Sequence, residues 1–138
     1  YYILRVQWLY GEHGHHFIKT ILNLMESKPK LDIVDDQFGS PTSTVEVACC
    51  VNTFLTKKPA YGIYHVANQG YASWHDLASY VRDKTKPDYE INKTTSEAFI
   101  RPAKRPKNGR LSLQKYLDLG GYAPLTWQKA VDQYLERK

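Results

Sequence analysis

The residues best suited to bind a ligand are one tryptophan and one polar segment. Residues 35–42 read Asp-Asp-Gln-Phe-Gly-Ser-Pro-Thr and follow a short apolar stretch. Asp36 and Gln37 can hydrogen-bond hydroxyl groups or the edge of a base, and Pro41 lies just before a predicted helix N-terminus, which favours anions. Trp8 precedes another polar loop at the end of an apolar stretch. Its ring is therefore placed either to stack on a sugar or base or to pack in the core.

Basic side chains gather in a second segment, residues 101–110, which also holds two prolines and a glycine. Guanidinium groups match phosphate oxygens, and the prolines reduce the entropy lost when the segment orders. The net charge is +5 but signs are mixed elsewhere, so this local cluster favours a phosphate-bearing ligand over a nucleic-acid face. Nucleic-acid binding would favour aromatics between the charges, and a solvated surface loop is the remaining alternative. The cluster consists of Arg101, Lys104, Arg105, Lys107 and Arg110.

Two other patterns resemble catalytic or metal sites. Glu12, His13, His15 and His16 crowd one loop, but their spacing matches none of the usual zinc patterns, so we interpret them as a solvated loop. The pair Tyr80–Lys84 fits Tyr-x-x-x-Lys, in which a lysine lowers the tyrosine pKa for proton transfer. Tyr80 falls on the apolar side of its predicted helix, so we interpret this pair as core packing.

The sequence also predicts neither a dinucleotide site nor a disulfide. No G-x-G-x-x-G sequence occurs, so no dinucleotide site is predicted in this chain. Cys49 and Cys50 are adjacent, which disfavours a disulfide between them and indicates reduced residues in a cytoplasmic protein.

Strands and helices alternate along most of the 138 residues, which suit a single domain. This order predicts an α/β fold with few parallel strands and flanking helices, in which ligands bind beyond the carboxyl ends of strands. Ser43 and Glu46 are spaced as a capping box, and Ser73 and Thr126 are placed to cap helices. Strands are predicted at 1–8, 31–34, 63–67 and 89–92, helices at 17–25, 43–55, 73–81, 112–119 and 126–135, and a long loop with one helical turn near Glu97 at 93–110.

Taken in order, these segments resemble the dTDP-4-dehydrorhamnose reductase family of extended short-chain dehydrogenases. The family reduces the C4 ketone of dTDP-4-dehydro-L-rhamnose, giving dTDP-L-rhamnose, with NADPH or NADH. The resemblance implies that this chain is the C-terminal substrate-binding part of a Rossmann-type enzyme. The dinucleotide-binding half and the catalytic Thr, Tyr and Lys would then lie upstream, so this chain would hold no catalytic residue and bind no cofactor alone. The matching stretches are residues 4–11, 14–17 with 19–20, 34–42, 62–67, 73–74 and 105–111.

The resemblance also implies which side chains meet the nucleotide sugar. The family tryptophan that contacts the sugar matches Trp8, and the segments at 36–42 and 105–110 border the cleft. Four positions depart from the family pattern: Val6-Gln7 stands for Thr-Ser, His16 for Asn, and Gly109 for Ser. These departures concern the identity of the sugar more than the fold. The expected substrate-binding residues are Trp8, Asp36, Gln37, Pro41, Arg105, Asn108 and Arg110.

The expected partners are a dTDP-sugar and the missing N-terminal half. Because the sequence begins at Tyr1 and no leader or membrane-length apolar run is visible, we expect a cytoplasmic fragment or processed product. The first strand would leave an exposed edge, which predicts self-association or a homodimer. Two rival functions remain: a non-catalytic module that regulates a partner, as one family relative does for methionine adenosyltransferase, and a small nucleic-acid-binding domain.

Overall fold

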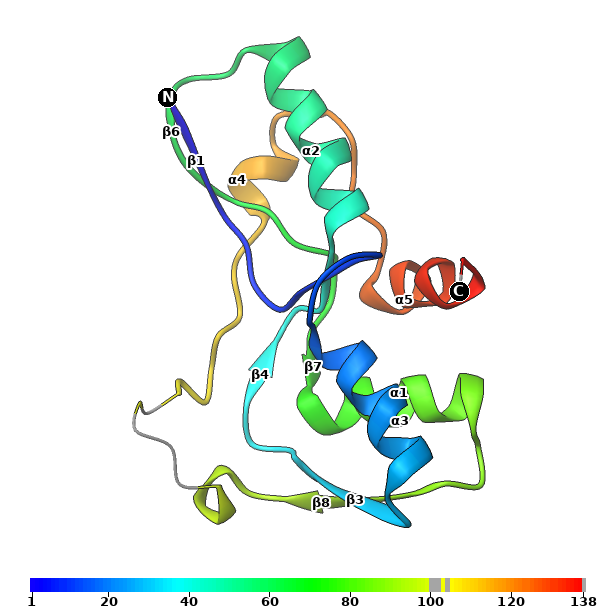
Figure 1. The fold of residues 1–138 in the computed structure, drawn as a ribbon. Helices are drawn as coiled ribbons and strands as arrows, with labels where there is room; N and C mark the ends of the chain where they lie inside the picture. Colours follow the sequence, from blue (N-terminus) through cyan, green and yellow to red (C-terminus); the bar gives the residue numbers. More distant parts are fainter. Residues whose placement is uncertain (100–102, 104, 138) are drawn as a thin grey trace.

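The computed structural model describes residues 1–99, 103 and 105–137, and its elements form two groups (Figure 1). The strands are short and the helices are the longer elements. The predicted α/β alternation with parallel strands is confirmed. The elements are β1 (Tyr2–Arg5), β2 (Leu9–Tyr10), α1 (Phe17–Ser27), β3 (Lys30–Val34), β4 (Phe38–Gly39), β5 (Thr42–Ser43), α2 (Thr44–Lys57), β6 (Gly62–His65), β7 (Ala72–Ser73), α3 (Trp74–Thr85), β8 (Glu90–Thr94), η1 (Ser96–Ala98), α4 (Gln114–Leu117) and α5 (Trp127–Glu136).

One group contains the parallel pair β1 and β6, with α2 and α4 beside it (Figure 1). The strands alternate in burial, as a sheet covered on one face does. Side chains on the covered face pack into a core that contains Cys50, Phe54, Tyr64 and Tyr116. Burial raises the pKa of the Cys50 thiol to about 11, and both cysteines are free, which fits the packing interpretation.

The other group contains the parallel pair β3 and β8, with α1 and α3 on one side of it (Figure 1). Leu31 lies opposite Ile91 in this pair, and both are buried. The larger core lies between these strands and the helices α1, α3 and α5. Its buried members include Ile18, Ile21 and Val131.

Short strand pairs lie between the two groups. β2 pairs with β5 in parallel, and β4 pairs with β7 antiparallel. The segment 35–42, expected to be a loop, therefore contains β4 and the start of β5. The first strand was predicted to reach Trp8, which is wrong because β1 ends at Arg5. Trp8 has φ of 45°, in the left-handed region, and a residue with that backbone cannot continue a strand.

Two predicted helix caps have different outcomes. Ser73 and Asp76 form a reciprocal capping box at α3, with bonds of 3.0 and 2.9 Å. Ser43 caps α2 through the Val45 amide, but Glu46 does not return to it, so the capping box predicted there is wrong. Glu46 instead accepts hydrogen bonds from residues distant in sequence.

Glu46 joins α2 to the segment before α5. The carboxylate is buried, with 4% of the residue exposed, and accepts from the Leu125 amide at 2.7 Å and the Tyr122 hydroxyl at 2.8 Å. The Asn68 amide group donates to it at 3.3 Å. Buried carboxylates need such partners, since an unpaired charge is costly inside a protein. No helix of the described chain is long and apolar enough to cross a membrane.

Candidate ligand-binding groove

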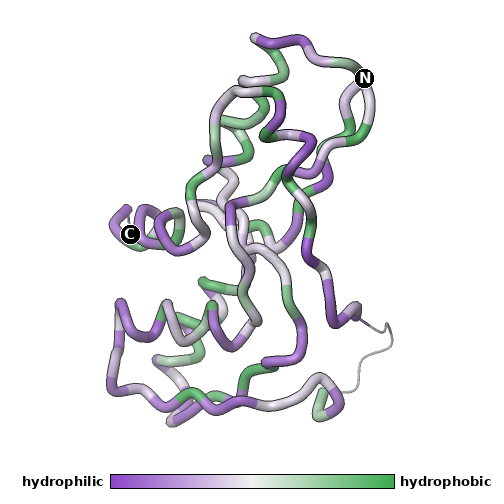
Figure 2. Tube along the Cα trace, turned by 180° about the vertical axis from the view of Figure 1, so that it is seen from behind, coloured by the Kyte–Doolittle hydropathy of each residue, from purple (hydrophilic) through white to green (hydrophobic). Residues whose placement is uncertain are grey.

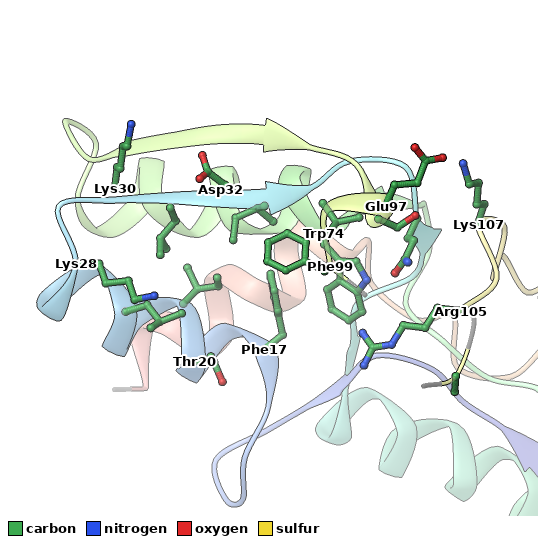
Figure 3. Close-up of a pocket in the computed structure, with 18 residues that line it drawn as sticks. Phe17, Thr20, Lys28, Lys30, Asp32, Trp74, Glu97, Phe99, Arg105 and Lys107 are labelled. Atoms are coloured by element: carbon green, nitrogen blue, oxygen red, sulfur yellow. The ribbon is translucent and has the colours of Figure 1, made fainter. Parts of the chain in front are cut away.

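An open groove of about 1160 Å³ lies between α1, β3 and the described residues in 96–99, 103 and 105–107 (Figure 3). Its size suits a small-molecule ligand, for which pockets of roughly 300–1,000 Å³ are usual. Figure 3 shows Lys30 and Asp32 on the opposite side of β3 from Phe17 and Lys28. Of the other charged residues that line the groove, Lys107 is paired with Asp36, and Lys28 and Arg105 outnumber Glu97, which favours an anion. The apolar wall is formed by Phe17, Ile21, Leu24, Leu31, Ile33, Val34, Trp74 and Phe99, and the charged groups are Lys28, Lys30, Arg105, Lys107, Asp32 and Glu97.

The Asp36 side chain connects two segments at the edge of the groove, one that contains Ser96 and one that contains Lys107. Its carboxylate accepts from the Ser96 amide at 2.9 Å and the Ser96 hydroxyl at 2.8 Å, and pairs with the Lys107 ammonium at 3.2 Å. Burial raises the pKa of Asp36, but the hydrogen bonds and the ammonium outweigh it and hold the pKa below its usual value. We call this set, Asp36, Ser96 and Lys107, the rim latch. Its geometry positions neighbouring groove residues, including Phe99 and Arg105.

The segments 35–42 and 105–110, which the sequence analysis singled out separately, lie side by side. Phe38 donates to the Lys107 carbonyl and accepts from the Gly109 amide, both at 2.9 Å, so Asn108 lies opposite Phe38 in a parallel bridge. The Arg110 guanidinium lies 4.7 Å from the Phe38 ring centre. Figure 2 shows that the chain through 105–110 is mostly hydrophilic.

The other predicted site residues take different positions. Gln37 is buried and lines the groove, and Arg105 reaches over it (Figure 3). Pro41 is fully buried and is not among the described lining residues, so its contact with a ligand stays a prediction. The Asn108 side-chain oxygen accepts from the Arg110 amide. Arg101 and Lys104 lie outside the described residues.

Trp8 stacks on a second tryptophan. The Trp8 and Trp74 rings are 3.6 Å apart between centres and 15° from parallel, and Phe17 lies 4.6 Å from Trp74. Trp8 is half-buried and is not among the described groove-lining residues, whereas Trp74 is. Phe17 and Trp74 fall at the starts of the predicted helices 17–25 and 73–81, where apolar side chains at helical spacing predict packing. The signal that this interpretation passed over is their place at helix starts, directly after polar loops.

No sequence motif predicts the other residues that line the groove. Lys28 and Lys30 flank the start of β3, and Phe99 follows η1. Charged residues at a strand end and one aromatic in a long loop are ordinary surface features. These residues line one groove only because α1 and the chain after β8 both lie against β3.

Two departures from the family pattern meet in space. Gln7, with its amide oriented by its neighbours, donates to the Gly109 carbonyl at 2.6 Å and accepts from the Ser40 amide at 3.0 Å. A Cβ at Gly109 would lie 3.2 Å from the Phe38 carbonyl oxygen and 3.5 Å from the Gln7 side-chain atom that is the amide nitrogen in this orientation. The larger side chain at position 7 thus occupies space beside the smaller residue at 109.

The Tyr-x-x-x-Lys pair has structural partners. The Tyr80 hydroxyl donates to Asp132 at 3.0 Å, and Lys84 pairs with the same carboxylate at 3.1 Å. Burial raises the pKa of Tyr80, and the hydrogen bond to Asp132 raises it further, which is opposite to the shift a proton donor at neutral pH needs. The contacts agree with a packing role.

The two sites suggested by histidines or carboxylates also have internal partners. His16 caps α1 through the Lys19 amide and lies 3.3 Å from the Tyr134 hydroxyl. Asp35, His75 and Asp76 bring ligand atoms within 4.8 Å of one another. Asp35, however, already accepts from Ser73 at 2.6 Å and pairs with Lys93 at 2.9 Å.

The fold and the anion-favouring groove define an α/β ligand-binding domain, and comparisons place it more closely. The model of the RmlD substrate binding domain family matches residues 1–138, and the chain belongs to that family. It is 35% identical over 136 residues to the spore coat polysaccharide biosynthesis protein SpsK of Bacillus subtilis, covering 99% of this chain and 47% of that protein. It is 33% identical to the dTDP-4-dehydrorhamnose reductase of Salmonella typhimurium, over 83% of this chain and 42% of the reductase.

Solved structures agree. A dTDP-4-dehydrorhamnose reductase from Clostridium acetobutylicum superposes with a TM-score of 0.91 at 38% identity, covering 99% of this chain and 48% of that one. The Bacillus anthracis reductase, solved in complex with NADP, gives 0.93 at 28% identity, covering 100% and 49%. The Bacillus cereus UDP-glucuronic acid 4-epimerase shares the fold at 18% identity, with a TM-score of 0.73 over 97% of this chain and 43% of that one. The chain spans about half the length of the relatives it matches.

Proposed function

We propose that residues 1–138 form a single nucleotide-sugar-binding domain whose ligand is dTDP-4-dehydro-L-rhamnose. The observation that carries the proposal is the groove, in which Phe17, Trp74 and Phe99 form an aromatic wall near the Arg105 guanidinium (Figure 3). The aromatic and apolar side chains suit a base or sugar face, and the guanidinium and ammonium groups suit a diphosphate. Family membership and relatives that reduce dTDP-4-dehydrorhamnose support this choice.

In the whole enzyme, the substrate's C4 ketone would be reduced at the expense of NADPH or NADH. This chain does not fit a nicotinamide cofactor, because its sequence contains no G-x-G-x-x-G turn between a strand and a helix. Its contribution is to hold the substrate, and fixed geometry can supply a large part of a rate enhancement. The isolated chain should therefore bind the sugar nucleotide weakly and turn nothing over.

One face of the β1–β6 pair is a candidate surface for contact with the dinucleotide-binding half. The face of β1 and β6 away from α2 exposes Ile3 and Ile63, which are 44% and 42% exposed. In the described chain, β1 pairs with β6 and has no other strand partner. We propose that the dinucleotide-binding half covers this face and continues the sheet. Without it, the exposed edge favours self-association.

Calorimetric titration tests the proposed ligand. The 138-residue chain, alone and joined to an upstream dinucleotide-binding half from a relative, is titrated with dTDP and dTDP-L-rhamnose. Binding of dTDP-L-rhamnose by the joined protein is the expected result. Absence of binding there would favour the regulatory-module alternative, and tight, steeply salt-dependent binding of DNA or RNA would favour the nucleic-acid alternative. Reduction of the keto sugar with NADPH by the isolated chain would contradict its assigned role.

A further inference from the structure

The backbone of Trp8 adopts a conformation that its type disfavours. Its φ is 45°, and a large side chain in the left-handed region persists only where its surroundings enforce it. The Trp8 carbonyl accepts from the Thr42 amide at 3.1 Å, which ties this bend to β5. An observed outlier of this kind is a reason to ask what holds the ring and why.

The Trp8 ring lies between two residues, Trp74 and Gly39. Trp74 stacks against one face at 3.6 Å. Gly39 lies at the ring edge, since a Cβ built there would be 2.7 Å from Cε2 of Trp8. Gly39 has no positive φ, so its lack of a side chain is explained by this close approach and not by backbone conformation. Together these contacts fix the orientation of the indole.

Trp74 is itself rigidly held. It is the first residue of α3, directly after Ser73, whose capping box fixes the helix start. The Ser73 hydroxyl also donates to Asp35 at 2.6 Å, at the end of β3. Trp74 lines the groove as well (Figure 3), so one ring contacts both Trp8 and the space proposed for the ligand.

We propose that Trp74 and Gly39 are positioning residues that hold the Trp8 ring in the orientation in which it contacts the sugar. The inference rests on the proposed function, because it takes the ligand to be a nucleotide sugar whose sugar extends beyond the described groove-lining residues to the Trp8 ring, which stacks on Trp74. Neither residue is assigned a contact with the reacting atoms. Their role is to prevent the indole of Trp8 from rotating to other orientations before the sugar arrives, which lowers the entropy lost on binding.

The test compares the affinities of dTDP-L-rhamnose and dTDP, since their ratio isolates the sugar contact. Trp8→Leu should lower that ratio by about threefold to tenfold, the range of a single aromatic contact. Trp74→Leu should lower it as well, and the double variant should lose less than the product of the two single effects, the remainder being the contact that Trp74 makes as part of the groove wall. Trp74→Phe, which keeps a ring, should restore most of the ratio. Trp127→Phe is the matched control and should leave it unchanged.

Gly39→Ala provides a second route if Trp74→Leu unfolds. Its added Cβ meets the Trp8 ring at 2.7 Å and the Gln7 side chain at 2.9 Å while the stacking partner stays, so the ratio should fall. Circular dichroism follows the coupled signal of the two stacked indoles in each variant. The proposal is overturned if Trp74→Leu and Gly39→Ala keep the wild-type ratio while Trp8→Leu loses it, or if the Trp8 and Trp74 effects multiply. If wild type binds neither compound, the proposed function itself fails; if it binds both with a ratio that Trp8→Leu leaves unchanged, only the positioning inference fails.

Discussion

Replacement of Glu46 should destabilise the fold far more than loss of a helix cap does. Glu46→Ala removes the acceptor of the Leu125 amide, the Tyr122 hydroxyl and the Asn68 amide group from a site that is 4% exposed. Hydrogen bonds to charged groups contribute about 1.5–3 kcal/mol each, and Asn68 keeps a second acceptor in the Leu125 carbonyl. The expected loss is therefore about 3–5 kcal/mol, against about 1 kcal/mol for a capping-box role.

Thermal and urea unfolding measure this difference. For a domain of this size a loss of 3–5 kcal/mol lowers Tm by roughly 10–15 °C. Glu46→Gln keeps part of the acceptor capacity and should cost about 1–2 kcal/mol. Glu12→Ala is the control at an exposed glutamate and should stay within about 0.5 kcal/mol of wild type. A Glu46→Ala chain that unfolds within about 1 kcal/mol of wild type would refute the reasoning.

Three further predictions concern Asp36 beside the groove, the Tyr80–Lys84 pair and the exposed face of β1 and β6. Asp36→Asn should weaken dTDP binding severalfold by calorimetry although it removes a negative charge, whereas Asp32→Asn, with the same charge change, should bind as well as wild type or better. Because the Asp36 pKa is lowered, the stability that its ionised carboxylate contributes is fully present above the ordinary carboxyl pKa of about 3.9. That stability is lost only as the pH falls through the lower folded value, and hydrogen exchange of the Ser96 amide would report the loss. Tyr80→Phe should cost about 1 kcal/mol in unfolding and leave dTDP affinity unchanged; loss of binding would contradict a packing role. Sedimentation should show self-association that Ile3→Lys reduces, and a monomeric wild type would count against the exposed-face argument.

Much of the fold could be predicted because its cues are local. Apolar side chains at helical spacing marked α1, and Ser73 with Asp76 marked the start of α3. The two-residue strands could not be found in this way. β4 and β5 are too short to show alternation. β4 pairs with β7 and with the chain at 107–109, and β5 pairs with β2. Long-range pairing of that kind leaves no signal in neighbouring residues.

The candidate site was predicted in part. Gln37 and Arg105 were expected to bind the substrate; both line the groove, and their contact with a ligand stays a prediction. Glu46 was predicted to bond to the start of its own helix. It bonds instead to the Leu125 amide, 79 residues away, which a capping-box spacing cannot predict. Asp36 was expected to meet a ligand, yet its oxygens are engaged by Ser96 and Lys107. That arrangement depends on how the chain returns after β8, which local patterns do not encode.

Amide chemical-shift mapping tests the central claim most directly. Titration of dTDP-L-rhamnose into the labelled 138-residue chain should shift amides that border the groove, at Phe17, Gln37, Trp74, Phe99 and Arg105. Arg105→Gln should weaken these shifts, because it removes a guanidinium from the expected diphosphate position. Shifts confined to the outer surface of α2, or no saturable shifts for dTDP-L-rhamnose even when the dinucleotide-binding half is joined, would contradict the account.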